Sequence, residues 1–108
     1  MSQTGIFHYI DAAGADVFQQ WLDRLADTRC RIAILRRVDR LALGNAGDCK
    51  FCRDGVWELR VDCGPGYRVY YCRLRRGNWL ILGAGSKQTQ RADITTAIER
   101  RREFEVRE

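Results

Sequence analysis

The hydrophobic pattern divides the first part of the chain into a short β-rich run and two amphipathic segments. Residues 6–10 carry β-branched and aromatic side chains, which predict a short strand. Apolar side chains recur at helical spacing in residues 13–26 and again in residues 28–43, where Gly44 ends the pattern. We expect these two helices to form a hairpin. The inward row predicted for the second helix consists of Ile32, Leu35, Val38, Leu41 and Ala42.

Two alternating segments predict a β-hairpin in the middle of the chain. In residues 56–62, and again in residues 67–73, apolar and polar side chains alternate, as expected of strands with one buried face. The segment Gly64-Pro65-Gly66 between them fits a type II turn, because proline supplies a fixed φ and glycine a positive one. The polar face predicted for this hairpin contains Glu58, Arg60, Arg68 and Tyr70.

The remaining elements complete an α+β architecture. Residues 79–82 are uniformly apolar and predict a central strand, buried on both faces, that ends at residues 83–85. Residues 90–106 predict a basic, partly buried helix. The order is a strand, two helices, three antiparallel strands and a helix, which we interpret as one domain over residues 1–108. We therefore expect a small antiparallel sheet with an N-terminal helical hairpin and a C-terminal helix.

The charge is distributed unevenly along the chain. Nineteen lysines and arginines against 14 acidic residues give a net charge of +5. Residues 1–28 carry a net charge of −3, whereas residues 29–108 carry +8. Such an excess favours a polyanionic partner, either nucleic acid or an acidic protein, and the alternative is a solvated basic surface without a partner. No apolar stretch is long enough to span a membrane and the first residues do not resemble a secretory leader, so we expect a cytoplasmic protein without membrane contact.

The five cysteines predict free thiols. Their number is odd, which argues for reduced thiols in a cytoplasm and against a disulfide framework. Cys49 and Cys52 form a C-x-x-C motif, but the chain offers neither a second close pair nor a histidine pair for a zinc ion. The single histidine is His8. We therefore expect no bound metal and no cofactor.

Four blocks of sequence resemble the HigB-type branch of the RelE/ParE toxin superfamily, whose members are often called addiction module killer proteins. The blocks are residues 44–50 (GNAGDCK), 55–60 (GVWELR), 64–71 (GPGYRVYY) and 87–90 (KQTQ). The resemblance implies a RelE-like fold and a small toxin of a type II toxin–antitoxin module. It also implies that the toxin inhibits translation by cutting mRNA on the ribosome. The implied partner is a cognate antitoxin, a small helix-turn-helix DNA-binding protein that neutralises the toxin.

The polar face of the predicted hairpin carries residue types that suit metal-independent RNA cleavage. This reaction uses the 2′-hydroxyl of the substrate as the nucleophile, so the protein supplies a base, an acid and cations around the phosphate. Glu58 is the candidate base, and the alternative is a surface ion pair with an arginine. The resemblance places Arg68 and Lys87 at positions whose cations stabilise the phosphate. Their alternative roles are pairing with Glu58 and ordinary solvation, respectively.

Other residues have two interpretations each. Arg60 is either a second phosphate ligand or the partner of Glu58. Tyr70 either contacts RNA, by stacking on a base or donating to the leaving oxygen, or packs within the sheet. Lys50 precedes the predicted strand that carries Glu58 and is a candidate contact for the RNA backbone. A cationic helix face that binds RNA or is simply solvated is predicted from Arg36, Arg37 and Arg40.

Two other functions remain open at this point. ParE-like members of the superfamily poison DNA gyrase by binding it, without nuclease chemistry. A degenerate member would only bind an antitoxin and regulate its operon. The cluster of Glu58, Arg60, Arg68 and Tyr70 favours the nuclease, because a gyrase-binding module has no need of it.

Overall fold

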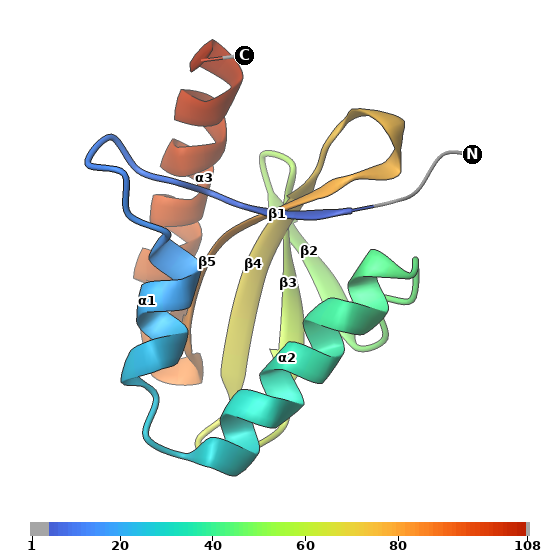
Figure 1. Ribbon diagram of the computed structural model, residues 1–108, viewed down its shortest axis with the longest axis vertical. Coiled ribbons are helices and arrows are strands. Elements are labelled where there is room, and N and C mark those ends of the chain that lie inside the picture. Colours follow the sequence, from blue (N-terminus) through green and yellow to red (C-terminus); the bar gives the residue numbers. More distant parts are fainter. Residues whose placement is uncertain (1–4, 108) are drawn as a thin grey trace.

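The computed structural model describes residues 5–107, and all structural statements below concern that part of the chain (Figure 1). The elements in chain order are β1 (Ile6–His8), α1 (Val17–Arg24), α2 (Thr28–Ala42), β2 (Cys49–Arg53), β3 (Val56–Val61), β4 (Tyr67–Arg73), η1 (Arg75–Gly77), β5 (Trp79–Ser86), η2 (Lys87–Thr89) and α3 (Gln90–Arg107). The α+β class and the C-terminal helix are confirmed. Among the described residues, no helix is long and apolar enough to cross a membrane.

One five-stranded sheet forms the centre of the molecule, in the order β1-β5-β4-β3-β2. The neighbours from β2 to β5 pair antiparallel, whereas β1 pairs with β5 in parallel. The expectation of a purely antiparallel sheet is therefore wrong at β1, and the edge strand β2 was not predicted. The central position of β5 between β1 and β4 is confirmed, although the strand continues through its glycines to Ser86.

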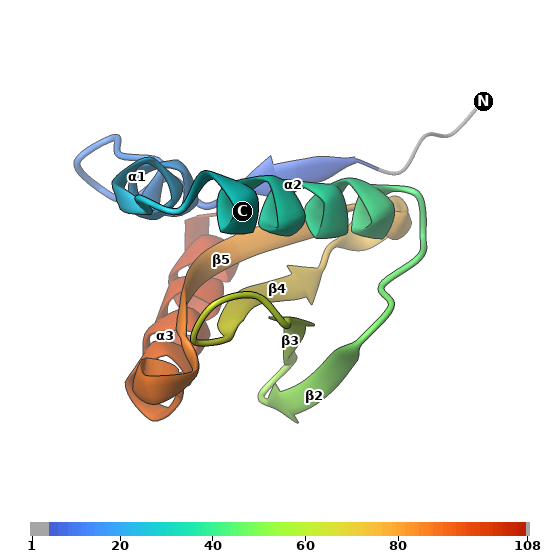
Figure 2. The same ribbon diagram turned by 90° about the horizontal axis from the view of Figure 1, so that it is seen from below.

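The helices cover both faces of this sheet (Figure 2). Helices α1 and α2 lie on one face, where α1 packs against β5 and α2 against β3 and β1, and α3 lies on the other face against β5, β4 and β3. The predicted helical hairpin is wrong, because α1 and α2 diverge and each is a single helix on the sheet. Asp16 and Asp27 cap these helices by accepting hydrogen bonds from the backbone N–H groups of Gln19 and Cys30.

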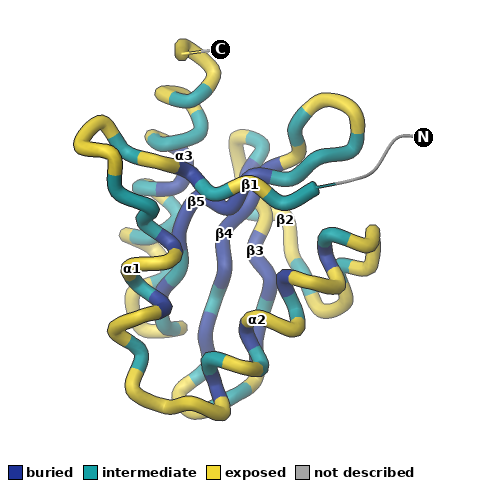
Figure 3. The backbone as a smooth tube through the Cα atoms, viewed as in Figure 1, coloured by how far each residue is buried: buried dark blue, intermediate teal, exposed yellow. Residues whose placement is uncertain are grey.

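Each face of the sheet has its own apolar core, and the dark-blue strands of Figure 3 lie between the two. The core under α1 and α2 includes Phe18, Leu22, Ile34, Leu59 and Val69, all at most 1% exposed. The core under α3 includes Val56, Tyr70, Leu80, Leu82 and Ile98. Each such side chain contributes about 1.5–3 kcal/mol by leaving water, so these two layers fix where α3 meets the sheet.

The inward face of α2 differs from the predicted row. Ile32 and Leu35 are 45% and 42% exposed, so their predicted inward positions are wrong. The buried row is instead Cys30, Ile34, Val38 and Leu41. The helix is rotated relative to the expectation because its contacts with the sheet, rather than its own periodicity, choose which stripe is covered.

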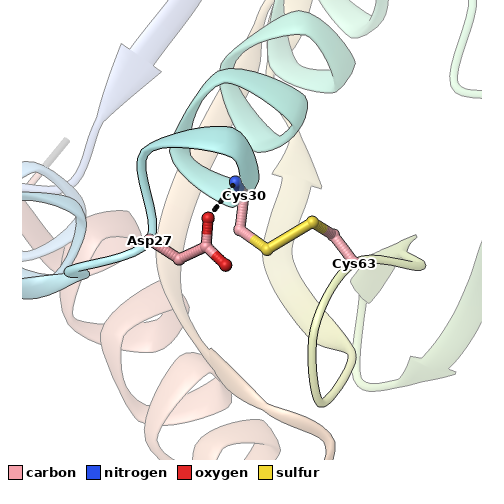
Figure 4. The surroundings of a disulfide bond; sticks show 3 residues. All are labelled: Asp27, Cys30 and Cys63. Carbon is pink, nitrogen blue, oxygen red and sulfur yellow. Dashed lines mark hydrogen bonds between the residues drawn. A yellow bond between two sulfur atoms is a disulfide. The ribbon is translucent and has the colours of Figure 1, made fainter.

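A disulfide joins Cys30 at the start of α2 to Cys63 in the turn between β3 and β4 (Figure 4). The expectation of reduced thiols is therefore wrong for these two residues, and the free cysteines are Cys49, Cys52 and Cys72. The bond closes a sequence separation of 33 residues and ties the helical layer to the turn that precedes Arg68.

Two glycines of β5 allow α3 to approach the sheet closely. A Cβ atom added to Gly83 would lie 2.6 Å from Nη1 of Arg100, and one added to Gly85 would overlap the carboxylate of Asp93. The Arg100 guanidinium donates a hydrogen bond to the carbonyl of Leu82 at 2.8 Å. Close packing at these glycines sets the start of α3 over the polar face of β3 and β4.

Candidate functional site on the α3 face of the sheet

The candidate site is built from adjacent rows of side chains on the face that α3 covers. Lys50, Glu58 and Tyr70 occupy one row across β2, β3 and β4, and Arg60 pairs with Arg68 in the next row. Because side chains on a strand alternate between faces, residues two apart on β3 and β4 share this face. The structure thus brings together the four side chains of the predicted polar face.

Glu58 is the only polar or charged residue in the buried class among the described residues, at 2% exposure. Its Oε2 atom forms an ion pair with Nε of Arg68 at 2.8 Å, and the Arg68 side chain is 13% exposed. Its Oε1 atom accepts hydrogen bonds from Nε2 of Gln90 at 2.8 Å and from the thiol of Cys52 at 3.3 Å. Oε1 is therefore hydrogen-bonded, whereas Oε2 and Nε of Arg68 contact each other as an ion pair and have no hydrogen bond within residues 5–107. The pair is buried rather than at the surface.

Burial also keeps the acidic neighbours of Glu58 protonated. Burial, and then the hydrogen bond to Glu58, raise the pKa of the Cys52 thiol to about 12. The pKa of Tyr70 is raised chiefly by burial and further by the charge of Glu58, against a lowering effect of Arg68. The Tyr70 hydroxyl is buried and has no hydrogen-bond partner in residues 5–107. A phenol that keeps its proton can act as a proton donor.

Arg60 does not hold Glu58 in place. Its guanidinium pairs with Oδ1 of Asp48 at 2.9 Å, and both side chains are well exposed, at 39% and 57%. The interpretation of Arg60 as the partner of Glu58 is therefore wrong, because Arg68 has that position. An exposed pair exchanges partners at little cost, so Arg60 remains able to bind a phosphate.

Lys87 and Lys50 lie at opposite sides of the buried pair and are both exposed. Lys87 begins η2, where its backbone N–H donates to the carbonyl of Gly66 at 2.9 Å, beside the end of β4 that carries Arg68. Lys50 lies on the edge strand β2, in the same row as Glu58. Neither ammonium group has an ion-pair partner among the described residues, so both are available to an anion.

Helix α2 lies on the other face of the sheet (Figure 2), so its arginines do not join this cluster. Arg36 and Arg40 are exposed. Arg37 points to the β2–β3 region, where its guanidinium donates to the carbonyls of Ala46 and Asp48 at 2.9 Å and also to that of Arg60. The prediction of a common outward RNA-binding face is wrong for Arg37, because its donors are used within the chain.

Three residues at the site were not identified from the sequence. Gln90 and Cys52 bind the carboxylate of Glu58, and Asp48 binds Arg60. Cys52 could have been found by recognising that β2 is a strand, which places it on the same face as Lys50. Gln90 belongs to the block 87–90, but only its hydrogen bond reveals its role.

Within residues 5–107, no group of three or more histidine, cysteine, aspartate or glutamate side chains is arranged to hold a metal ion. A cavity of about 260 Å³ lies between α1, β5 and α3, with Asp93 and Arg100 among its lining residues. None of the predicted catalytic residues lines this cavity. The chemistry-bearing groups are thus gathered on the sheet surface at the start of α3 rather than in a deep pocket.

The fold and the site define a small basic α+β protein in which a carboxylate–guanidinium pair is buried between the sheet and its C-terminal helix. Residues 20–102 match the model of the family described as phage-derived protein Gp49-like (DUF891), and the chain belongs to that family. This is a RelE-like toxin family of toxin–antitoxin modules. The chain is also 42% identical, over 80 residues, to an uncharacterized protein of Haemophilus influenzae (strain ATCC 51907 / DSM 11121 / KW20 / Rd). That match covers 74% of this chain and 81% of the relative.

Proposed function

We propose that this protein is the toxin of a type II toxin–antitoxin module and acts as a metal-independent mRNA endonuclease on the ribosome, as HigB-type toxins do. Membership of the Gp49-like family supports the toxin role. The observation that carries the nuclease assignment is the Glu58–Arg68 pair, with Tyr70 in the adjacent position on the same face. These groups supply a base, a phosphate-binding cation and a proton donor within two rows of one sheet.

In this proposal the 2′-hydroxyl of the substrate attacks the adjacent phosphorus, and the bond to the 5′-oxygen breaks. Glu58 accepts the 2′-hydroxyl proton, and the phenol of Tyr70 donates a proton to the leaving oxygen. Arg68 neutralises charge on the pentacovalent phosphate, while Arg60, Lys50 and Lys87 bind neighbouring phosphates. The products are a 2′,3′-cyclic phosphate and a free 5′-hydroxyl.

Glu58 must exchange a partner before it can act. Gln90 occupies the Oε1 atom that an attacking hydroxyl needs, and it is the first residue of α3. Its side chain is half-buried and long enough to rotate away without unfolding the helix. Substrate binding is therefore expected to replace the Gln90 amide with the 2′-hydroxyl, which gives Gln90 a positioning role.

The test is single-turnover cleavage of ribosome-bound mRNA, with cut sites located by primer extension. Glu58→Gln keeps the size of the side chain but removes the base, so the rate should fall by roughly 10²- to 10⁴-fold with RNA affinity retained. The matched control is Glu99→Gln, which removes the same charge from an exposed position of α3. Its rate should stay within threefold of the wild type. A folded Glu58→Gln protein that cleaves at the wild-type rate contradicts the base assignment.

One observation favours a second candidate function, in which the protein binds and poisons DNA gyrase. The charges of Glu58 and Arg68 are paired with each other within the chain and Glu58 is 2% exposed, as expected of a structural ion pair. Expression in cells separates the two functions. Discrete cuts in mRNA support the nuclease, whereas double-strand breaks in DNA without mRNA cuts support gyrase poisoning.

The proposed partner is a cognate helix-turn-helix antitoxin, which family membership suggests. The net charge of +8 in residues 29–108 favours an acidic antitoxin segment, because complementary charge speeds association. Purified toxin and the neighbouring gene product should elute as one complex at micromolar concentration. Separate elution would contradict the module assignment.

A further inference from the structure

The last residue of β4 and the turn that follows it carry three arginines. We call Arg73, Arg75 and Arg76 the arginine turn. The backbone N–H of Leu74 donates to the carbonyl of Asn78 at 2.7 Å and closes the turn. Arg76 has a φ of +63°, a left-handed conformation that is unusual for a residue with a side chain. The backbone at Arg76 is therefore strained, because glycine or asparagine is the ordinary residue at such a position.

Gly5, the residue before β1, is hydrogen-bonded to the end of the same turn. The side-chain oxygen of Asn78 accepts a hydrogen bond from the backbone N–H of Gly5 at 3.0 Å, and the backbone N–H of Trp79 donates to the carbonyl of Gly5 at 2.9 Å. Contacts from both sides hold the backbone of the arginine turn. Guanidinium groups on a held backbone lose less entropy when they bind a ligand than groups on a mobile loop.

The charges of the arginine turn are not neutralised within the described residues. Its three arginines are exposed, and none forms an ion pair in residues 5–107. Six other arginines of the chain do form such pairs: Arg53, Arg60, Arg68, Arg101, Arg102 and Arg107. Three unpaired cations within four positions form a concentrated positive surface, whose natural ligand is a polyanion.

Aromatic rings accompany these cations. The guanidinium of Arg73 lies over the ring of Trp79, 5.3 Å from its centroid. Phe7 is 52% exposed, and a Cβ atom added to Gly5 would touch both Asn78 Oδ1 at 3.5 Å and the Phe7 ring at 3.6 Å. The exposed ring therefore lies next to the turn. Trp79 is partly buried against the core, so Phe7 is the ring here that is open to a base. RNA offers phosphates that bind guanidinium groups and unpaired bases that stack on such a ring.

We propose that the arginine turn is a second RNA-binding surface that grips the phosphate backbone away from the cleavage site. Arg68 and Arg73 are five residues apart on β4, about 17 Å along an extended strand, and side chains an odd number of residues apart face opposite sides of the sheet. Arg68 lies on the side of α3, whereas Arg73 lies on the other side, over the ring of Trp79. The arginine turn is therefore a contact separate from the cleavage site. The inference extends the proposed nuclease function, since it adds a contact that positions the substrate or ribosomal RNA without taking part in the chemistry.

The experiment compares two charge-matched double variants of the full chain. Arg75→Gln/Arg76→Gln removes two charges from the arginine turn, and Arg24→Gln/Arg29→Gln removes two from exposed, unpaired arginines near the α1–α2 connection. Binding to a fluorescent 20-nucleotide 2′-O-methyl RNA is measured by anisotropy at several salt concentrations. This RNA has no free 2′-hydroxyl for cleavage, so the result is independent of whether the protein is a nuclease.

Two phosphate contacts to a single strand correspond to a loss of about 1.4 in the salt slope and at least about tenfold in affinity at 0.1 M salt. We expect this loss for the turn variant and less than threefold for the control. Equal losses in both variants, or no loss in the turn variant, overturn the proposal. Arg75→Gln/Arg76→Gly is measured in parallel, because glycine suits the positive φ and keeps the turn folded.

A further arm tests whether the surface binds an acidic protein instead. Polyglutamate competes for cations but offers neither phosphates nor bases. Removing two cations weakens binding of either polyanion, so the two losses are compared. If the turn variant loses clearly more affinity for RNA than for polyglutamate, the RNA assignment is supported. If the two losses are equal, or the loss for polyglutamate is larger, the assignment to RNA is overturned in favour of an acidic protein partner.

Discussion

Separating Glu58 from Arg68 should be among the most destabilising single changes at the sheet surface. Both side chains are at least 87% buried, with exposures of 2% and 13%. Removing one partner leaves the other charge in a low-dielectric site, where such losses amount to roughly 3–5 kcal/mol. Because Arg68 keeps some contact with solvent, we take the lower end, about 3 kcal/mol, for Glu58→Leu and also for Arg68→Met.

The double variant distinguishes a buried pair from two independent contributions. In Glu58→Leu/Arg68→Met no unpaired charge remains, so its cost should be smaller than that of either single change. For a chain of 108 residues, 3 kcal/mol corresponds to a fall in Tm of about 13 °C. The control is Arg60→Met, which breaks the exposed pair with Asp48 and should cost at most about 1 kcal/mol.

Urea unfolding at pH 7 without reductant, followed by tryptophan fluorescence, measures all four variants. The expected order is wild type, Arg60→Met, the double variant and then the two single variants. The reasoning is refuted if Arg68→Met costs no more than Arg60→Met. It is equally refuted if the costs of the two single changes simply add in the double variant, because the pair then has no coupling.

Three further outcomes are expected. Arg37→Ala should lower the free energy of unfolding by about 1.5–3 kcal/mol, since the Arg37 guanidinium binds backbone carbonyls. The control Arg36→Ala should change it by less than 0.5 kcal/mol, and urea titration compares the two variants. Reductant should lower the free energy of unfolding by roughly 3–4 kcal/mol, because it breaks the disulfide that closes the Cys30–Cys63 loop of 33 residues. It should leave the Cys30→Ala/Cys63→Ala variant unaffected. Burial raises the pKa of Cys72 from 9.0 to about 11, so the folded state keeps the thiol proton up to a higher pH than the unfolded state. The free energy of unfolding should therefore fall between pH 9 and 11, and it should fall less steeply in Cys72→Ala.

The alternation of apolar and polar side chains within single strands was enough to predict the polar face of the hairpin. Side chains alternate along a strand, so Glu58 and Arg60 had to share a face, and the turn at Pro65 brought Arg68 and Tyr70 opposite them. The apolar run at Trp79 likewise identified an internal strand. These predictions succeeded because each depends on neighbours within a few residues.

Contacts between segments that are distant in the sequence determined three features that the local hydrophobic pattern did not predict: the strand β2, the buried side of α2 and the disulfide. The segment Cys49–Arg53 has mixed polarity and becomes a strand through its hydrogen bonds with β3. The rotation of α2, which leaves Ile32 exposed, follows from its contacts with the sheet. The partner of Cys30 is 33 residues away, and nothing in the spacing of the cysteines selects Cys63.

The sequence by itself determined which chemical groups share a face of the sheet, and only the tertiary structure decided how accessible they are. Gln90 lies 32 residues beyond Glu58, yet its amide binds the carboxylate because glycines in β5 let α3 approach the sheet. Accessibility is the sum of contacts from every element packed against a residue. Alternation along β3 therefore identifies Glu58 as a polar-face residue, and the docking of α3 makes it a buried one.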